Sequence, residues 1–174
     1  MRYNPGIHHR RSIRLKEYDY SQCGAYFINI CTKNRECYFE TYSVLKNIVK
    51  TEWENIPNQY PHIELDEYVI MPDHFHGILI INDDNDYCIV GAIHELPLQE
   101  SWKIRRKMMI PKIVGKFKMQ TAKKINQVRN TPGVPFWQRN YYEHIIRSED
   151  ELNRIREYII NNPSQWKSDK NISK

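Results

Sequence analysis

Long apolar runs are missing from this sequence. No stretch reaches the roughly 18 consecutive apolar residues that a membrane-spanning helix needs. Residues 1–16 are basic and polar, and they contain no apolar segment of the kind found in secretory signals. We therefore expect a cytoplasmic protein that does not enter a membrane.

Cysteine is also sparse. The chain has Cys23, Cys31, Cys37 and Cys88. These residues lack the C-x-x-C spacing of a zinc site, and they are too few in 174 residues for a small disulfide scaffold. We expect reduced and mostly buried thiols.

Internal repeats, low-complexity tracts and the charge excess of a disordered chain are absent as well. Hydrophobic residues make up 40% and charged residues 27% of the sequence, as in a folded globular protein. A chain of 174 residues is long enough for one core and short for two. We expect one domain over residues 1–174.

Positive charge is present in clusters, with 26 Lys and Arg against 21 Asp and Glu. Clustered positive charge attracts a polyanion by releasing its counterions, although the solvated faces of basic helices produce the same pattern. The candidates for binding nucleic-acid phosphates lie in a basic N-terminal arm (1–20) and on a helix further along the chain. They are Arg10, Arg11, Arg14, Lys112, Lys116, Lys118, Lys123 and Lys124.

Alternating side chains and β-branched residues predict the strands of one sheet. We expect strands over 24–32, 64–71, 75–81 and 141–146, with 37–39 as a short hairpin partner of the first. The strands 64–71 and 75–81 are joined by the Pro72-Asp73 turn. They should pair antiparallel in the middle of the sheet.

Helical spacing of apolar residues predicts helices from Thr41 to a stop at Pro57, from Pro111 to a break at 131–133, and from Glu149 to about Asn162. Ser148 and Glu151 form a capping box for the last helix (148–163), which Pro163 should end. Residues 83–109 show no period and read as a long loop insertion. The element order predicts an α+β, ferredoxin-like split β-α-β sandwich, an antiparallel sheet with helices on one face, plus a C-terminal helix.

Two local patterns carry possible chemistry. In His74-Phe75-His76 both imidazoles point to one face of a strand, a geometry suited to a metal. One chance H-x-H is unsurprising among seven histidines, so the motif taken alone favours a structural or surface role. On the last helix, Tyr158 and Asn162 lie one turn apart on a face that also carries apolar residues. Without further information, a core tyrosine and an asparagine that finishes the helix are the favoured explanation of that second pattern.

Three ordered segments resemble a known family: YVIMPDHFHGIL at 68–79, FWQRNYYEHIIR at 136–147 and LNRIREYIINNP at 152–163. They look like the REP-associated tyrosine transposases, which belong to the HUH single-tyrosine transposases, and the resemblance runs from Tyr20 to Trp166. The resemblance implies that His74 and His76 are metal ligands, that Tyr158 is the nucleophile and that Asn162 is the third ligand. Tyr141 and Tyr142 are rival phenols that rank behind Tyr158.

The same resemblance implies a metal-dependent endonuclease and strand transferase that uses Mg²⁺ or Mn²⁺ and forms a 5′-phosphotyrosine intermediate. The expected partner is single-stranded DNA beside imperfect palindromic hairpins of the REP kind, and the expected assembly is a monomer or a homodimer. The last helix (148–163) would then be the catalytic helix.

Two other functions stay open from the residues. A non-catalytic module that binds single-stranded nucleic acid could use the same fold, although the Gly-aromatic signature of RNA-binding sheets is missing. A hydrolytic metalloenzyme built on H-x-H would need further strong ligands, and His62, His94 and His144 show no spacing that supplies one. Trp102, Phe136 and Trp137 are candidates for stacking on unpaired bases, with a core role favoured for Phe136 and Trp137.

Overall fold

Strand β1 (Gly24–Cys31) lies in the interior of the sheet. The computed structural model describes residues 18–82 and 108–172, with 167–172 described as backbone only. Strands β2 (Ile63–Ile70), β3 (His74–Ile81) and β4 (Tyr142–Ile146) complete an antiparallel sheet in the order β2-β3-β1-β4. This is the ferredoxin-like order that the sequence predicts.

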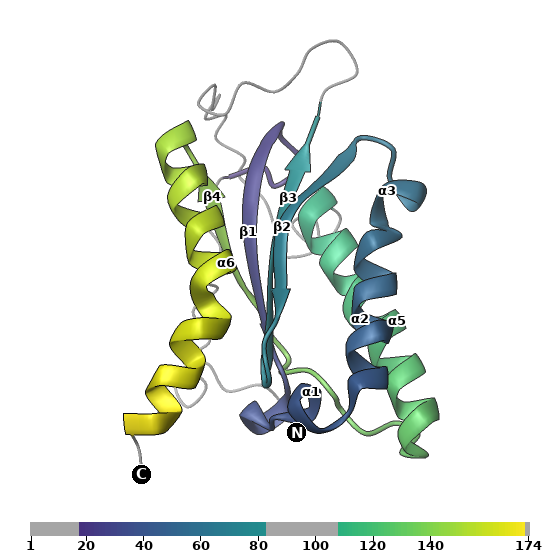
Figure 1. Ribbon diagram of the computed structural model, residues 1–174. Coiled ribbons are helices and arrows are strands. Elements are labelled where there is room, and N and C mark those ends of the chain that lie inside the picture. Colours follow the sequence, from purple (N-terminus) through teal and green to yellow (C-terminus); the bar gives the residue numbers. More distant parts are fainter. Residues whose placement is uncertain (1–17, 83–107, 173–174) are drawn as a thin grey trace, which may run out of the picture.

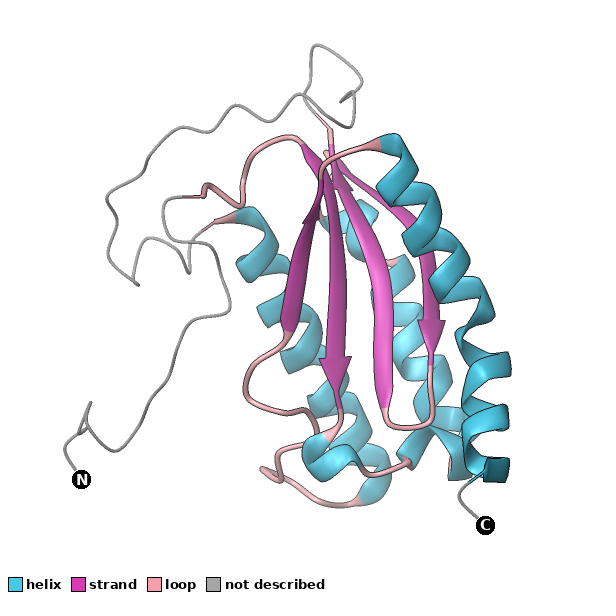
Figure 2. Ribbon diagram, turned by 90° about the vertical axis from the view of Figure 1, so that its left-hand side faces the viewer, coloured by secondary structure: helices cyan, strands magenta, loops and turns pink. Residues whose placement is uncertain are grey.

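The sheet lies between two helical layers (Figures 1 and 2). Helices α2 (Ser43–Glu54) and α5 (Met109–Arg129) cover one face, and α6 (Glu149–Ile172) runs along the other. None of the helices in the described part of the chain is long and apolar enough to cross a membrane. The position of α6 divides the buried residues into two groups.

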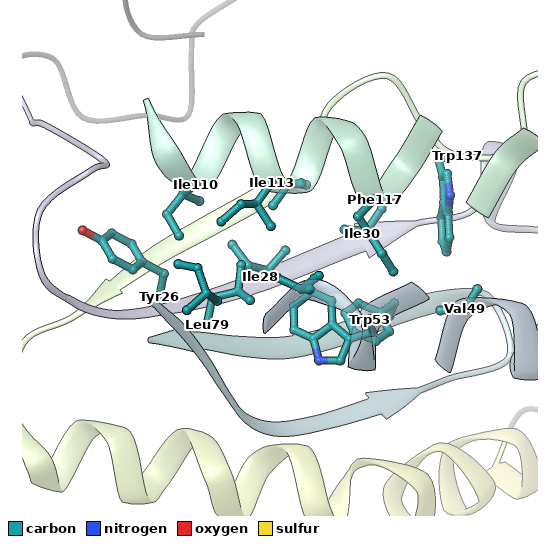
Figure 3. Close-up of a cluster of buried hydrophobic side chains, with 14 of the residues drawn as sticks. Tyr26, Ile28, Ile30, Val49, Trp53, Leu79, Ile110, Ile113, Phe117 and Trp137 are labelled. Carbon is teal, nitrogen blue, oxygen red and sulfur yellow. The ribbon is translucent and has the colours of Figure 1, made fainter. Parts of the chain in front are cut away.

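The larger core lies between the sheet and the α2 and α5 layer (Figure 3). Tyr26, Ile28 and Ile30 of β1 point into it, as do Trp53 of α2 and Phe117 of α5. Phe136 and Trp137 also belong to this core, so both have the structural role that was favoured for them and neither is placed to stack on a base. The smaller cluster, beneath α6, consists of Ala25, Phe27, Ile78, Ile146, Leu152 and Ile159.

Gly77 is required by the packing of the larger core. A Cβ at this position would lie 2.5 Å from Cζ2 of the Trp53 ring, closer than carbon atoms can approach. The indole therefore packs directly on the backbone of β3. Phe75, two residues earlier on the same strand face, packs on the same indole with ring centroids 4.6 Å apart.

Two predictions about the first half of the chain are wrong. Residues 37–39 are not a hairpin partner, because the chain forms the short helices η1 (Lys33–Arg35) and α1 (Tyr38–Thr41), and one helical turn buries Phe39 completely. The pair β2 and β3 is antiparallel as expected, but β2 lies at an edge of the sheet and only β3 is interior. Pro57 does follow the end of α2, yet it also lies in the first turn of α3 (Ile56–Gln59), where proline is tolerated.

Pro163 does not end the last helix, which continues to Ile172. Proline removes only its own N–H from the helix ladder. Trp166, beyond the proline, packs near the His74 ring with centroids 5.8 Å apart, and this contact favours the added turns. The start of the helix is as predicted, since the Glu151 N–H donates to Ser148 Oγ at 3.2 Å. The Glu151 carboxylate accepts from the Arg147 N–H at 2.7 Å, one residue earlier than a capping box requires.

The cysteine prediction is wrong at one position. Cys23 is disulfide-bonded, whereas Cys31 and Cys37 are half-buried thiols outside any disulfide. Cys88 lies outside the described residues, as do Trp102, Arg10, Arg11 and Arg14 of the sequence-based predictions.

Candidate active site

The two histidines of H-x-H lie side by side at the start of β3, on the sheet face that α6 covers. His74 is 5% exposed and His76 is 2% exposed, and their ring centroids are 4.5 Å apart. Phe75 between them points into the larger core. The alternation of side chains along a strand therefore places both imidazoles together, as the sequence predicts.

A buried carboxylate holds the His74 ring. Asp73 Oδ1 accepts from His74 Nδ1 at 2.5 Å, and Asp73 Oδ2 forms an ion pair with Arg35 Nε at 2.8 Å. With the proton on Nδ1, the lone pair of neutral His74 is on Nε2. Histidine ligands in metal sites are typically oriented in this way: a carboxylate accepts from one ring nitrogen, and the other nitrogen is left for the metal.

Burial keeps both imidazoles neutral. It lowers the pKa of His74, against the opposing effect of Asp73, and it lowers the pKa of His76 to about 3, with further lowering from His74 and Arg35. Neutral imidazole is the form that binds a metal ion. At neutral pH each ring therefore has a nitrogen lone pair available.

His76 connects the strand to the last helix. Its Nδ1 is buried and has no hydrogen-bond partner among the described residues. Its ring stacks on Phe27 of β1, with centroids 5.2 Å apart and an interplanar angle of 26°. Its Nε2 lies 3.5 Å from the hydroxyl oxygen of Tyr158, at the limit of a hydrogen bond.

Tyr158 projects from α6 over the histidines. Its ring meets His76 with centroids 5.4 Å apart and Phe27 with centroids 6.3 Å apart, edge-on in both cases. The side chain is nevertheless 45% exposed, because α6 covers the sheet with the neighbouring Ile159, which is 1% exposed. A tyrosine with a purely structural role in the core does not fit this exposure, which leaves the phenol accessible from solution.

Asn162 lies one turn beyond Tyr158 and is 8% exposed. Tyr158 and Trp166, one turn to either side of Asn162 on α6, contact the rings of His76 and His74. Asn162 therefore lies on the helix face toward the histidines, and its amide oxygen, the Nε2 of His74 and a nitrogen of His76 are candidate donors to a cation. Two imidazoles and an amide fit a divalent ion that keeps coordination positions for water or phosphate oxygens. The described residues contain no group of three or more His, Cys, Asp or Glu that could hold a metal, so they offer no support for a closed zinc-type centre.

The predicted phosphate-binding lysines are on α5, on the opposite side of the sheet from α6, the helix that contains Tyr158 (Figure 1). Several of them make intramolecular contacts. Lys118 Nζ donates to three backbone carbonyls of residues 138–140, and Lys124 forms an ion pair with Glu52. Lys112 and Lys116 lie over the Tyr60 ring, at 5.8 and 5.4 Å from its centroid, and Lys123 is exposed. The structure does not bring these lysines together with the histidines.

Sequence reasoning missed three residues of the site. Asp73 could have been found, because a carboxylate next to a candidate ligand is a typical orienting group. Phe27 alternates along β1 with the core residues Tyr26 and Ile28, so its position predicts the opposite sheet face but no role. Arg35 gives no local signal, since its contact with Asp73 depends on how the chain turns after β1.

Comparisons with known proteins find two similar sequences in Haemophilus influenzae. No family model matches the chain. A Haemophilus influenzae protein described as uncharacterised is 45% identical over 180 residues, which cover 97% of this chain and 96% of that protein. A second H. influenzae protein, provisionally described as a REP-associated tyrosine transposase, is 26% identical over 147 residues, which cover 83% of this chain and 73% of that protein.

A similar fold is also present among solved structures. The structure of a REP-associated tyrosine transposase bound to a REP hairpin matches with a TM-score of 0.57 at 17% identity. The match covers 90% of this chain and 74% of the other chain, and it shows a shared fold.

Proposed function

This chain belongs to one family with its 45% identical H. influenzae relative and is related to the REP-associated tyrosine transposases, and on that premise we propose that it cuts and joins single-stranded DNA. In this proposal it is a metal-dependent endonuclease and strand transferase with Tyr158 as nucleophile. The observation that carries the proposal is the 3.5 Å approach of the Tyr158 hydroxyl to His76 Nε2, beside a second histidine that a carboxylate orients.

The reaction that fits these groups is a phosphoryl transfer. The Tyr158 oxygen attacks the phosphorus of a DNA linkage, the bond from phosphorus to the 3′ oxygen breaks, and a 5′-phosphotyrosine and a free 3′-hydroxyl result. The phosphodiester character is kept in the new bond, so a second 3′-hydroxyl can reverse the step and join strands. No nucleotide cofactor is needed.

His74, His76 and Asn162 would hold the cation, with Mg²⁺ and Mn²⁺ as the candidates. When bound, such an ion supplies positive charge that favours the phenolate and offsets the charge developing on the phosphate oxygens. Asp73 keeps the Nε2 of His74 unprotonated and directed away from the carboxylate. Phe27 packs on both the His76 and Tyr158 rings, and so limits how far either ring can turn.

The position of α6 supports attack within one chain. Arg156 on α6 makes a bidentate ion pair with Asp66 of β2, with Nε 3.1 Å from Oδ1 and Nη2 2.6 Å from Oδ2. This pair ties the helix to the sheet two residues before Tyr158. Because the phenol already lies against the histidine of its own chain, a monomer can supply the whole site.

We propose single-stranded DNA next to a hairpin as the substrate, since the solved relative of the same fold is bound to a REP hairpin. The test is incubation of the protein with labelled hairpin DNA carrying single-stranded flanks, with Mn²⁺, followed by denaturing electrophoresis. We expect a covalent protein–DNA adduct that needs Mn²⁺ and is absent in Tyr158→Phe.

Tyr142→Phe is the matched control, because Tyr142 is also 45% exposed and also contacts Phe27. The control should keep the adduct. An adduct that persists in Tyr158→Phe and disappears in Tyr142→Phe would transfer the nucleophile to the other phenol. Binding of DNA without any adduct would favour a non-catalytic binding module.

A further inference from the structure

A groove opens beside the candidate active site, between β4 and the first turns of α6. It has a volume of about 410 Å³ and is lined by Phe27, Tyr142, His144, Glu151, Arg154 and Ile155. Its volume is that of a pocket for a small organic group. None of these residues except Phe27 has a part in the chemistry proposed above.

The groove is continuous with the nucleophile through one ring. Phe27 lies edge-on to Tyr158 with centroids 6.3 Å apart, and edge-on to Tyr142 with centroids 6.4 Å apart. The phenylalanine therefore separates the two exposed phenols. A strand whose phosphate lies at Tyr158 reaches the groove within a few nucleotides.

One wall of the groove is aromatic and accessible. Tyr142 is 45% exposed although it belongs to a strand, and Ile155 and Phe27 add apolar surface behind it. An exposed aromatic ring against apolar walls is the surface on which unpaired bases stack, whatever their identity. A double-stranded helix offers no free base face to such a wall.

The opposite side of the groove carries a cation. Arg154 is exposed, and its Nε makes one long hydrogen bond, of 3.4 Å, to the Asp150 carbonyl. Most of the five guanidinium donors therefore remain for a ligand. The one carboxylate in the lining, Glu151, already accepts from the Arg147 N–H and from His144 Nε2, at 2.7 and 2.8 Å. Both carboxylate oxygens of Glu151 are therefore engaged, and the remaining donors of Arg154 are the ones in the lining that suit an anion such as a phosphate group.

We infer that this groove is a subsite for one unpaired nucleotide of the DNA strand, with Tyr142 stacking on its base and Arg154 contacting a phosphate. The inference rests on the proposed function, because it places the nucleotide on the strand that Tyr158 cuts. Tyr142 and Arg154 are then DNA-binding residues, which the sequence-based list of basic residues on α5 does not include.

The test measures binding separately from cleavage. The full chain carrying Tyr158→Phe is titrated into fluorescently labelled oligothymidylate, and anisotropy gives the dissociation constant. Adding Tyr142→Ala should weaken binding about 5- to 150-fold, the range expected for loss of one base–aromatic stack. Tyr142→Phe should bind like its parent, because it keeps the ring.

Tyr42→Ala is the matched control. Tyr42 is 51% exposed, similar to Tyr142, but it lies between α1 and α2 on the other layer of the fold. Its replacement should leave binding unchanged. Equal affinities for Tyr42→Ala and Tyr142→Ala would overturn the inference.

Two further measurements separate the base from the backbone. On an oligonucleotide that lacks bases, the difference between the parent and Tyr142→Ala should vanish, and a difference that persists would contradict stacking. Arg154→Ala should reduce the slope of log affinity against log salt by the amount expected for the loss of about one phosphate contact. An unchanged slope would exclude Arg154 from the subsite. The Arg154→Ala measurement remains informative even if Tyr142→Ala folds poorly.

The outcome is distinguishable from failure of the proposed function. If the chain with intact Tyr158 forms the covalent adduct but Tyr142→Ala binds normally, only the subsite is wrong. If Tyr142→Ala weakens binding but no adduct forms under any metal condition, the subsite holds and the catalytic proposal fails. If an oligopeptide or a second copy of the chain competes at Tyr142 while DNA does not, the groove belongs to a protein contact.

Discussion

The role of Asp73 can be tested by removing its charge. Asp73→Asn keeps the size of the side chain, but it takes away the carboxylate that accepts from His74 Nδ1 at 2.5 Å and pairs with Arg35 at 2.8 Å. The amide can turn its NH₂ toward His74, which would then carry its proton on Nε2. That tautomer has no lone pair on Nε2 for a cation.

The expected effect is on metal binding more than on stability. Loss of such an orienting partner costs about 10- to 100-fold in metal affinity, which corresponds to about 1.4–2.7 kcal/mol. The Arg35 side chain is 47% exposed, so water can solvate it when its partner is neutral. The backbone carbonyl of Asp73, which accepts from Thr32, is not altered by the substitution.

The assay is the yield of covalent adduct as a function of Mn²⁺ concentration, with Mn²⁺ binding measured directly by calorimetry. The Asp73→Asn curve should shift to about 10- to 100-fold higher Mn²⁺ and recover at saturation. Glu52→Gln is the matched control, because Glu52 is also a buried carboxylate paired with an exposed cation, Lys124, but it lies on α2, on the other side of the sheet from α6. Unchanged Mn²⁺ affinity in Asp73→Asn, or an equal loss in Glu52→Gln, would refute the reasoning.

Three further predictions concern stability and positioning. Gly77→Ala should destabilise the fold by about 1–3 kcal/mol in urea unfolding, because the new methyl group meets a buried indole at 2.5 Å. Arg156→Ala should lower stability by about 1.5–3 kcal/mol, and with Asp66→Ala the loss should be less than additive in a double-mutant cycle. The N–H of Arg147 lowers the pKa of Glu151 in the folded state. The ionised Glu151 carboxylate therefore stabilises the fold at pH values above the ordinary glutamate pKa, and this stabilisation is lost as pH falls through the folded pKa. Glu151→Gln should therefore be less stable than the parent at neutral pH, with a gap that closes in acid.

Local sequence patterns were sufficient for most of the architecture. Alternation and β-branched residues predicted the four strands, and helical spacing predicted α2, α5 and the start of α6, because these patterns depend on neighbours a few residues apart. The same alternation put His74 and His76 on one face, and helical geometry put Tyr158 and Asn162 on another. Two of the wrong predictions, at residues 37–39 and at Pro163, fall where a distant contact outweighs a local preference.

The candidate site itself was decided by the tertiary structure. The distance between Tyr158 and His76 depends on α6 packing across β1 and β3, and Arg35 reaches Asp73 only through the turn after β1. The lysines of α5 have the composition of a DNA-binding face, yet the crossover that forms the ferredoxin-like order places them on the far side of the sheet. A sequence specifies which side chains share a strand or a helix face through geometry that repeats every few residues. Which faces then meet is settled by the burial of apolar surface between elements far apart in the chain.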